Sequence, residues 1–194
     1  MVTIKSRGKI MNLPNTLTLI RIILVPIYLL IFFSELPNRI LLAGLIYILA
    51  GLTDVLDGHI ARKYDLKTKL GTVLDPLADK LMTFAILISF TLSNYIPGWI
   101  LLALGLKEIL MICGGASLYL SKENIVLPSN KFGKIATASF YAATISVIFN
   151  LPNLFSECLF ILTVLLNIFA FINYLTLYID VIKNKNNTQL TKDN

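Results

Sequence analysis

Residues 52–80, LTDVLDGHIARKYDLKTKLGTVLDPLADK, place aspartates between two long apolar runs. Asp54 and Asp57 stand at the end of the first run, and Asp75 and Asp79 stand at the start of the second. Residues three or four positions apart lie on the same face of an α-helix. Each aspartate pair is therefore predicted to share one helix face. Because a short loop joins the two helices, we expect antiparallel neighbours that bring all four carboxylates together.

The composition indicates an integral membrane protein built from helices. Of the 194 residues, 56% are hydrophobic and 14% are charged, whereas a soluble domain carries about 25% charged residues. The apolar runs have the length that a spanning helix needs, about 20 residues. Proline and asparagine separate the runs, as expected at turns and helix starts. We predict an all-α fold with six transmembrane helices, at about residues 16–34, 39–61, 70–93, 97–120, 132–150 and 154–182.

Basic residues predict the orientation. They cluster before the first span, after the sixth, and in the loops around 62–69 and 122–134, whereas the other loops contribute only Arg39. Because cytoplasmic loops carry an excess of Lys and Arg, both termini and the acidic stretch are predicted to face the cytoplasm, at the cell membrane. The net charge of +6 fits contact with an anionic leaflet. No basic stripe interleaved with exposed aromatics points to nucleic acid.

One membrane domain is predicted over residues 1–183. Its first dozen residues carry apolar side chains among three basic ones, which fits either a short interfacial helix or a solvated basic tail. Residues 184–194 are polar and are predicted to form a disordered tail.

The four carboxylates point to metal-dependent phosphoryl chemistry. Carboxylates gathered in one place repel each other unless a positive charge lies between them. Mg²⁺ and Mn²⁺ prefer oxygen ligands and also bind phosphate oxygens, and two such ions could stabilise the attacking and leaving oxygens of a displacement. Gly58 and Ala61 share the helix stripe of Asp54 and Asp57, so small residues border the acids. The alternative is a set of separate surface salt bridges with Arg62, Lys63 and Lys80.

The stretch reads Asp54-x2-Asp57-Gly58-x2-Ala61-Arg62-x8-Gly71-x3-Asp75-x3-Asp79. It resembles the signature of the CDP-alcohol phosphatidyltransferase family at all eight fixed positions, with the family's spacing. The segments NLPNTLTLIRIILVP (12–26) and NKFGKIAT (130–137) extend the resemblance over most of the chain. It implies an enzyme of phospholipid biosynthesis, which transfers the phosphatidyl group of CDP-diacylglycerol to an alcohol and releases CMP.

The resemblance also implies roles for individual residues. Asp54, Asp57 and Asp75 look like the principal ligands of two divalent ions, Mg²⁺ or Mn²⁺. Asp79 looks like a further ligand and like the base that accepts the proton of the attacking hydroxyl. The expected contacts to CDP-diacylglycerol come from small residues that leave room for the nucleotide (Gly58 and Ala61), from Arg62 on its phosphates, and from Gly71, which would let the loop backbone approach closely.

The acceptor alcohol is less closely specified. Relatives that use glycerol 3-phosphate usually carry an Arg-Glu pair in the fourth span and a second arginine shortly after it. Here Lys107-Glu108 and Gly115 stand at those places. Glycerol 3-phosphate is the expected acceptor, phosphatidylglycerol in a CMP-forming cardiolipin synthase is the alternative, and inositol phosphate or serine follows. The cationic residues that could bind the acceptor are Lys107, Lys131, Lys134 and Arg21.

Three other polar residues have two interpretations each. Arg21, inside the first span, either faces the nucleotide or the acceptor or extends to the cytoplasmic interface. Asn15 fits a helix N-cap after Pro14, or a headgroup contact. Asp75 either caps a helix that has Pro76 at its first position or precedes a proline kink in a longer helix.

A membrane transporter with buried carboxylates is the distant alternative from another functional class. Transporters often show internal repeats and polar residues spread over several spans, whereas the charges here concentrate at one pair of helices. The family resemblance also suggests a homodimer within the membrane lipids, although no packing motif in the sequence demands one.

Overall fold

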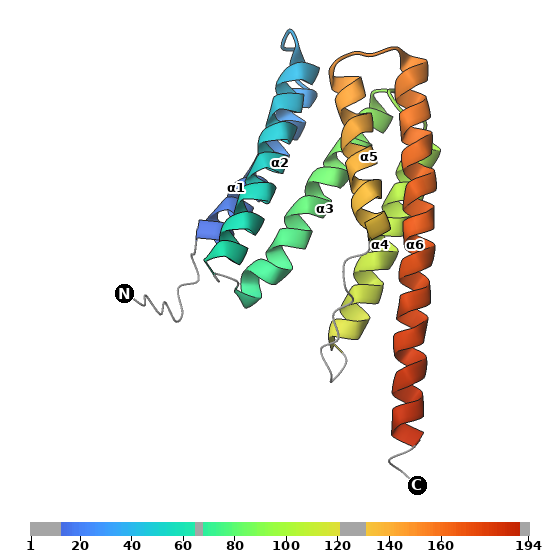
Figure 1. The fold of residues 1–194 in the computed structure, drawn as a ribbon. Helices are drawn as coiled ribbons and strands as arrows, with labels where there is room; N and C mark the ends of the chain where they lie inside the picture. Colours follow the sequence, from blue (N-terminus) through green and yellow to red (C-terminus); the bar gives the residue numbers. More distant parts are fainter. Residues whose placement is uncertain (1–12, 65–67, 121–130, 191–194) are drawn as a thin grey trace. The chain divides into compact units, whose positions relative to one another are not determined.

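The structure, a computed structural model, describes residues 13–64, 68–120 and 131–190. These residues form six α-helices and no strand, which confirms the predicted all-α class. The proposed N-terminal interfacial helix lies outside the described residues. The helices, shown in Figure 1, are α1 (Leu13–Phe32), α2 (Arg39–Lys63), α3 (Lys69–Leu92), α4 (Gly98–Leu120), α5 (Lys131–Ile148) and α6 (Asn153–Leu190).

Three asparagines mark the turns between helices. Asn38, Asn94 and Asn150 have φ angles of 60°, 58° and 52°. This left-handed conformation is unfavourable for most L-residues, but asparagine adopts it more readily because its short polar side chain can form local hydrogen bonds. The predicted turns at these three residues are therefore confirmed.

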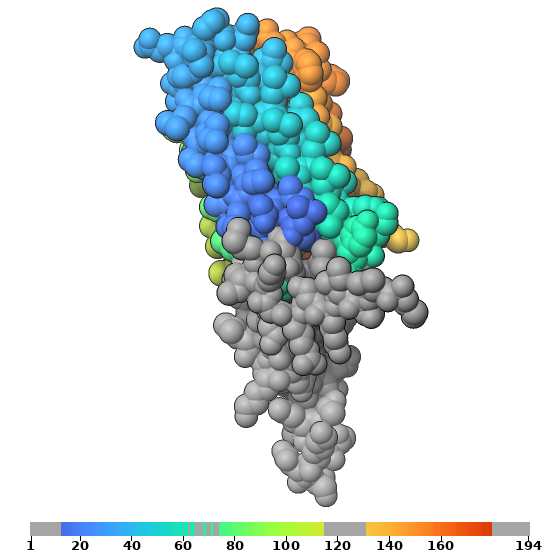
Figure 2. All heavy atoms as spheres, turned by 90° about the vertical axis from the view of Figure 1, so that its left-hand side faces the viewer, coloured from blue at the N-terminus to red at the C-terminus, as the bar shows by residue number. Residues whose placement is uncertain are grey.

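The helices group into two compact units, Met1–Leu92 and Ser93–Asn194. In the first unit, α1 packs along both α2 and α3, whereas α2 and α3 contact each other at only a few points. Figure 2 shows the side chains of α1 and α2 in contact along the two helices. The sequence predicted direct packing of α2 on α3, so the structure differs in making α1 the helix that both share.

Aromatic and small residues explain why α1 holds this place. The rings of Phe32 and Phe90 lie 5.9 Å apart between α1 and α3, and Ser89 of α3 donates a hydrogen bond to the Tyr28 hydroxyl. On α2 the buried residues include Ala43 and Ala50, which allow a close approach of helix backbones. Burial of this aromatic cluster and of the small-residue stripe therefore fixes α1 against its two neighbours.

The second unit is built on the hairpin of α5 and α6 (Figure 1). The rings of Phe140 and Phe160 meet edge to face at 6.3 Å, and Ser146 hydrogen-bonds to Ser156 across the hairpin. Helix α4 also packs against α6. Helix α6 continues to Leu190, into the segment predicted to be disordered. Residues 184–190 contain no proline or glycine to end the helix.

Three helices of the described part are long and apolar enough to cross a membrane: α1, residues 39–61 of α2, and residues 153–179 of α6. Large apolar side chains such as Leu30, Leu102 and Leu154 are exposed on the two units, which fits a lipid environment. Helix α3 carries Asp75, Asp79 and Lys80, which lower its hydropathy. The protein is therefore a helical membrane protein, and six spans with cytoplasmic termini stay a prediction.

Candidate functional site

The first acidic pair lies near the end of α2. Asp57 is buried, with 3% of its surface exposed, and the side chain of Asp54 is 43% exposed. They are three positions apart, so both point to the same side of the helix. A carboxylate as buried as Asp57 needs a partner of opposite charge, because an isolated buried charge is strongly disfavoured.

The second acidic pair lies in the first half of α3. Asp75 and Asp79 are four residues apart and half-buried. Pro76 lies inside the helix, which begins at Lys69. The prediction that Asp75 caps a helix starting at Pro76 is therefore wrong, and the alternative, a proline within a longer helix, is confirmed. Thr68 caps this helix instead, since its hydroxyl accepts a 2.9 Å hydrogen bond from the amide of Gly71.

The two acidic pairs interact electrostatically. The charges of Asp75 and Asp79 act on Asp54, and those of Asp75 and Asp54 act on Asp57. The acids of α2 are therefore repelled by acids of α3 within the first unit; the meeting of all four carboxylates at one point stays a prediction. This repulsion has to be balanced by cations.

Arg21 of α1 supplies one balancing charge. Its side chain is 2% exposed, its Nη1 lies 2.7 Å from Oδ1 of Asp54, and its Nη2 donates to Oδ2 of Asp57. Arg21 is thus enclosed by the protein and paired with the α2 acids, and its position relative to the membrane interface stays a prediction. Its predicted role toward the acceptor stays a prediction, because the partners that the structure gives it are the α2 acids.

A polar stripe on α1 continues from Arg21; the sequence singled out Arg21 and Asn15 but not Thr18 between them. Thr18, fully buried, donates to Oδ1 of Asp75. Asn15, 2% exposed, accepts a 2.9 Å hydrogen bond from Thr68. Asn15 therefore lies within α1 and is not its N-cap. The spacing of 15, 18 and 21, polar residues every third position in an apolar span, is the signal that could have revealed this stripe.

The donor set fits Mg²⁺ or Mn²⁺ in its chemistry. All four candidate ligands are carboxylates, and the Arg21 contacts leave one oxygen each on Asp54 and Asp57. Among the described residues no group of three or more His, Cys, Asp or Glu side chains is close enough to enclose an ion. Magnesium is commonly held by one or two carboxylates together with waters and substrate phosphates. Two separate acid pairs are compatible with magnesium coordination of this kind, which does not require the protein to enclose the ion.

The predicted nucleotide-binding residues are placed as follows. Gly58 and Ala61 are half-buried on α2, on the stripe of the acids. The side chain of Arg62 lies outside the described part of the structure. Gly71 lies in the first turn of α3, not in a loop, and a Cβ there would come within 2.6 Å of Oδ1 of Asn15. The close approach that requires glycine is thus made by α1.

The predicted acceptor-binding lysines belong to the second unit. Lys107 pairs with its neighbour Glu108 at 2.8 Å, and both side chains are largely buried. Lys131 and Lys134 are exposed, one turn apart at the start of α5. Lys107 is therefore charge-compensated within α4, while the two α5 lysines present their charge at a helix end.

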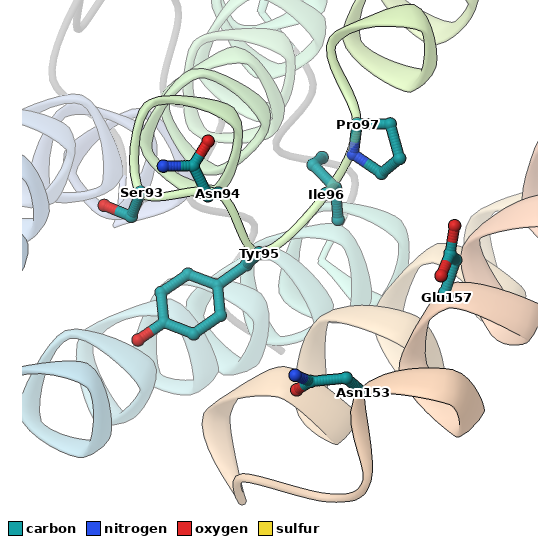
Figure 3. Close-up of a pocket in the computed structure, with 7 residues that line it drawn as sticks. All are labelled: Ser93, Asn94, Tyr95, Ile96, Pro97, Asn153 and Glu157. Atoms are coloured by element: carbon teal, nitrogen blue, oxygen red, sulfur yellow. The ribbon is translucent and has the colours of Figure 1, made fainter.

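Two hollows lie in the second unit, and no predicted site residue lines either of them. An apolar groove of about 380 Å³ lies between α4 and α6, beside Cys113 and Tyr174. A polar hollow of about 470 Å³ lies where the turn after α3 meets the start of α6 (Figure 3). This turn follows Leu92, about 20 Å along α3 from Asp79. The polar hollow is lined by Ser93, Asn94, Tyr95, Ile96, Pro97, Asn153 and Glu157.

Comparison with known proteins agrees with the motif. A sequence model described as CDP-alcohol phosphatidyltransferase matches residues 11–177, which include all four aspartates and the polar stripe of α1.

Named relatives cover most of the chain. The CDP-diacylglycerol–glycerol-3-phosphate 3-phosphatidyltransferase of Bacillus subtilis is 35% identical over 154 residues, 73% of this chain and 79% of that protein. A protein of the same name from Aquifex aeolicus is 36% identical over 174 residues, 88% of this chain and 93% of its own. A Mycobacterium bovis protein named "Putative cardiolipin synthase" is 32% identical over 140 residues, 72% of this chain and 66% of that protein.

Proposed function

Because the chain belongs to the CDP-alcohol phosphatidyltransferase family, we propose that it transfers the phosphatidyl group of CDP-diacylglycerol to glycerol 3-phosphate. The observation that supports this proposal is that the shared helix α1 packs against both acid-bearing helices and contacts acids of each. In the reaction, the acceptor hydroxyl oxygen attacks the phosphorus that bears diacylglycerol. The bond from this phosphorus to the CMP oxygen breaks, and CMP leaves.

The carboxylates are proposed to hold two divalent ions. Asp54, Asp57, Asp75 and Asp79 are the ligands in this proposal, and the supporting observations are their oxygen chemistry and their mutual repulsion. Bound Mg²⁺ or Mn²⁺ would supply positive charge to the diphosphate oxygens as the transferring phosphorus changes partner.

Asp79 is proposed to accept the proton of the attacking hydroxyl. Its side chain is 35% exposed, more open than the buried Asp57, so an incoming alcohol could reach it. The nearby ammonium of Lys80, at 3.5 Å, is also partly exposed and contributes little to holding the carboxylate in place. A carboxylate base needs such access, because it must lie within hydrogen-bond reach of the proton that it takes.

Gly58, Ala61, Arg62 and Gly71 are proposed to serve CDP-diacylglycerol binding. The half-buried surface of Gly58 and Ala61 lies beside the acids on α2 and has no side chain that would obstruct a nucleotide. Arg62 follows directly and would pair with the phosphates. For Gly71 the contribution is indirect, since its lack of a side chain lets Asn15 pack on α3.

The site is proposed to face the cytoplasm, where CDP-diacylglycerol and water-soluble acceptors meet. The basic residues at the acidic end of α2 and in the loop to α3 support this side. Lipid tails of the substrate would then stay in the bilayer beside the exposed apolar faces of the helices.

Glycerol 3-phosphate is the proposed acceptor because several relatives, including those of Bacillus subtilis and Aquifex aeolicus, carry it in their names. A phosphorylated acceptor needs cationic partners, and Lys131 and Lys134 offer exposed charge. Lys107 would serve this role only together with its partner Glu108.

Phosphatidylglycerol is the second candidate acceptor. A relative named as a cardiolipin synthase favours it, as does the replacement of the expected arginine by Lys107. An acceptor with two acyl tails depends less on cationic contacts.

Product analysis decides between the two. Purified protein is given labelled CDP-diacylglycerol with Mg²⁺, and glycerol 3-phosphate and phosphatidylglycerol are offered in separate reactions. The proposal predicts labelled phosphatidylglycerophosphate with the first acceptor and no cardiolipin with the second. Cardiolipin as the only labelled product would establish the second candidate. If CMP is released in the presence of neither acceptor, both candidates are refuted.

A further inference from the structure

Helix α1 connects the two halves of the acidic site. Both acid-bearing helices pack along α1, and they contact each other at only a few points. The relative placement of the α2 acids and the α3 acids therefore depends on what α1 presents to each. Two side chains of α1 contact these acids directly, Arg21 on α2 and Thr18 on α3.

Arg21 holds both acids of α2 at once. Its two terminal nitrogens contact Oδ1 of Asp54 and Oδ2 of Asp57. A planar guanidinium can span two carboxylates in this way, whereas the single ammonium of lysine cannot fix two directions. Each carboxylate keeps its second oxygen for another ligand. Arg21 is also more deeply buried than Asp54, so it supports the acid from the protein side.

Thr18 holds the first acid of α3. It precedes Arg21 by three residues and so lies on the same side of α1. Its hydroxyl, fully buried, donates to Oδ1 of Asp75 and leaves Oδ2 of that acid for another ligand. The carbonyl of Pro14 lies 3.1 Å from the same hydroxyl. Since a hydroxyl has one proton, donation to Asp75 competes with donation within α1.

We propose that Thr18 and Arg21 are positioning residues for the acidic site. They engage one oxygen of each acid from α1 and leave the second oxygens of Asp54, Asp57 and Asp75 for a further ligand. This inference rests on the proposed function, in which that ligand is a divalent cation. Partners that orient metal-binding side chains in this way typically change metal affinity or activity about 10–100-fold when removed.

The test measures Mn²⁺ binding to the purified full-length protein in detergent, by electron paramagnetic resonance of free Mn²⁺. Two variants are informative. Thr18→Val keeps the shape of the side chain and removes its hydroxyl. Arg21→Lys keeps the positive charge and removes the planar guanidinium that contacts two carboxylates. Thr18→Ser restores a hydroxyl. Thr144→Val is the matched control, since Thr144 is a buried threonine of α5 whose hydroxyl has no hydrogen-bond partner within the described residues.

Thr18→Val and Arg21→Lys are expected to weaken Mn²⁺ binding by about tenfold or more. Thr18→Ser is expected to recover most of the loss, and Thr144→Val to bind as the wild type does. With saturating Mn²⁺, kcat should fall in the two weakened variants, while KM for CDP-diacylglycerol stays close to the wild-type value. If the two substitutions only damaged the structure, the thermal stability of Thr18→Val and Arg21→Lys would fall together with their Mn²⁺ binding.

Folded Thr18→Val protein with wild-type Mn²⁺ affinity overturns the role of Thr18 even if Arg21→Lys does not fold. Tighter Mn²⁺ binding in Arg21→Lys overturns the role of Arg21, because it shows that the arginine competes with the ion. A failure of the proposed metal-dependent function gives a different result: the wild-type protein binds no Mn²⁺ and remains active with a chelator. That result refutes both the metal site and the positioning role of Thr18 and Arg21.

Discussion

Replacing Gly71 by alanine tests the junction between α1 and the start of α3. The new Cβ would lie 2.6 Å from Oδ1 of Asn15 and 3.1 Å from Oγ1 of Thr68. Asn15 is buried and accepts the hydroxyl proton of Thr68 at 2.9 Å. To make room, the amide of Asn15 must turn away and lose this hydrogen bond.

The magnitude follows from two opposing effects. Leaving a buried acceptor without its donor costs about 1–3 kcal/mol. Alanine in place of glycine favours the helix by up to about 1 kcal/mol, and by less in the first turn. We therefore expect Gly71→Ala to lower the free energy of unfolding by about 1–2 kcal/mol. Because Asp75 lies one turn further along α3, activity should fall as well.

The assay is unfolding by sodium dodecyl sulfate in mixed micelles, followed by circular dichroism. Gly133→Ala is the control, because a Cβ on that helical glycine of α5 meets no atom of the described residues within 4 Å. It should be neutral or stabilising. Asn15→Ala removes the closest clashing oxygen and leaves only the 3.1 Å contact with Oγ1 of Thr68, so adding Gly71→Ala to it should cause a much smaller loss. Equal stability of Gly71→Ala and Gly133→Ala, or an unchanged penalty in the Asn15→Ala background, would refute the reasoning.

Further predictions concern catalysis. A chelator such as EDTA should stop CMP release, and Mg²⁺ or Mn²⁺ should restore it; full activity in metal-free buffer is the contrary result. Asp79→Asn should lower kcat by about 10²–10⁴ as the proton acceptor is lost, and near wild-type turnover by the folded variant would exclude Asp79 as the base. Lys107→Ala should raise KM for glycerol 3-phosphate by about tenfold or more, with KM for CDP-diacylglycerol unchanged; an equal rise in both would exclude a contact specific to the acceptor.

The helices were predictable from the sequence because each contains a long apolar run, and asparagine and proline mark the turns after α1, α3 and α5. Asn38, Asn94 and Asn150 have the left-handed backbone that these turns adopt. Each can be recognised in the sequence because it stands between two apolar runs. The acidic pairs were predictable for the same local reason, since spacings of three and four residues determine a helix face without knowledge of the fold.

The role of α1 could not be predicted in this way. Helical periodicity shows which face of a helix is polar, but it does not show which other helix that face meets. Arg21 and its partner Asp57 are 36 residues apart in the sequence, and Thr18 and Asp75 are 57 apart. The short loop between α2 and α3 suggested direct packing, whereas the aromatic cluster of Tyr28, Phe32 and Phe90 favours α1 as the common neighbour.

The central claim is that acids from two different helices hold the same divalent ions. The most direct measurement is the number of Mn²⁺ ions bound tightly per chain by wild-type protein and by two single variants, Asp57→Asn on α2 and Asp75→Asn on α3. The account predicts two ions in the wild type and weakened or lost binding in each variant, although the substitutions lie on separate helices. Wild-type Mn²⁺ binding in both folded variants would contradict it.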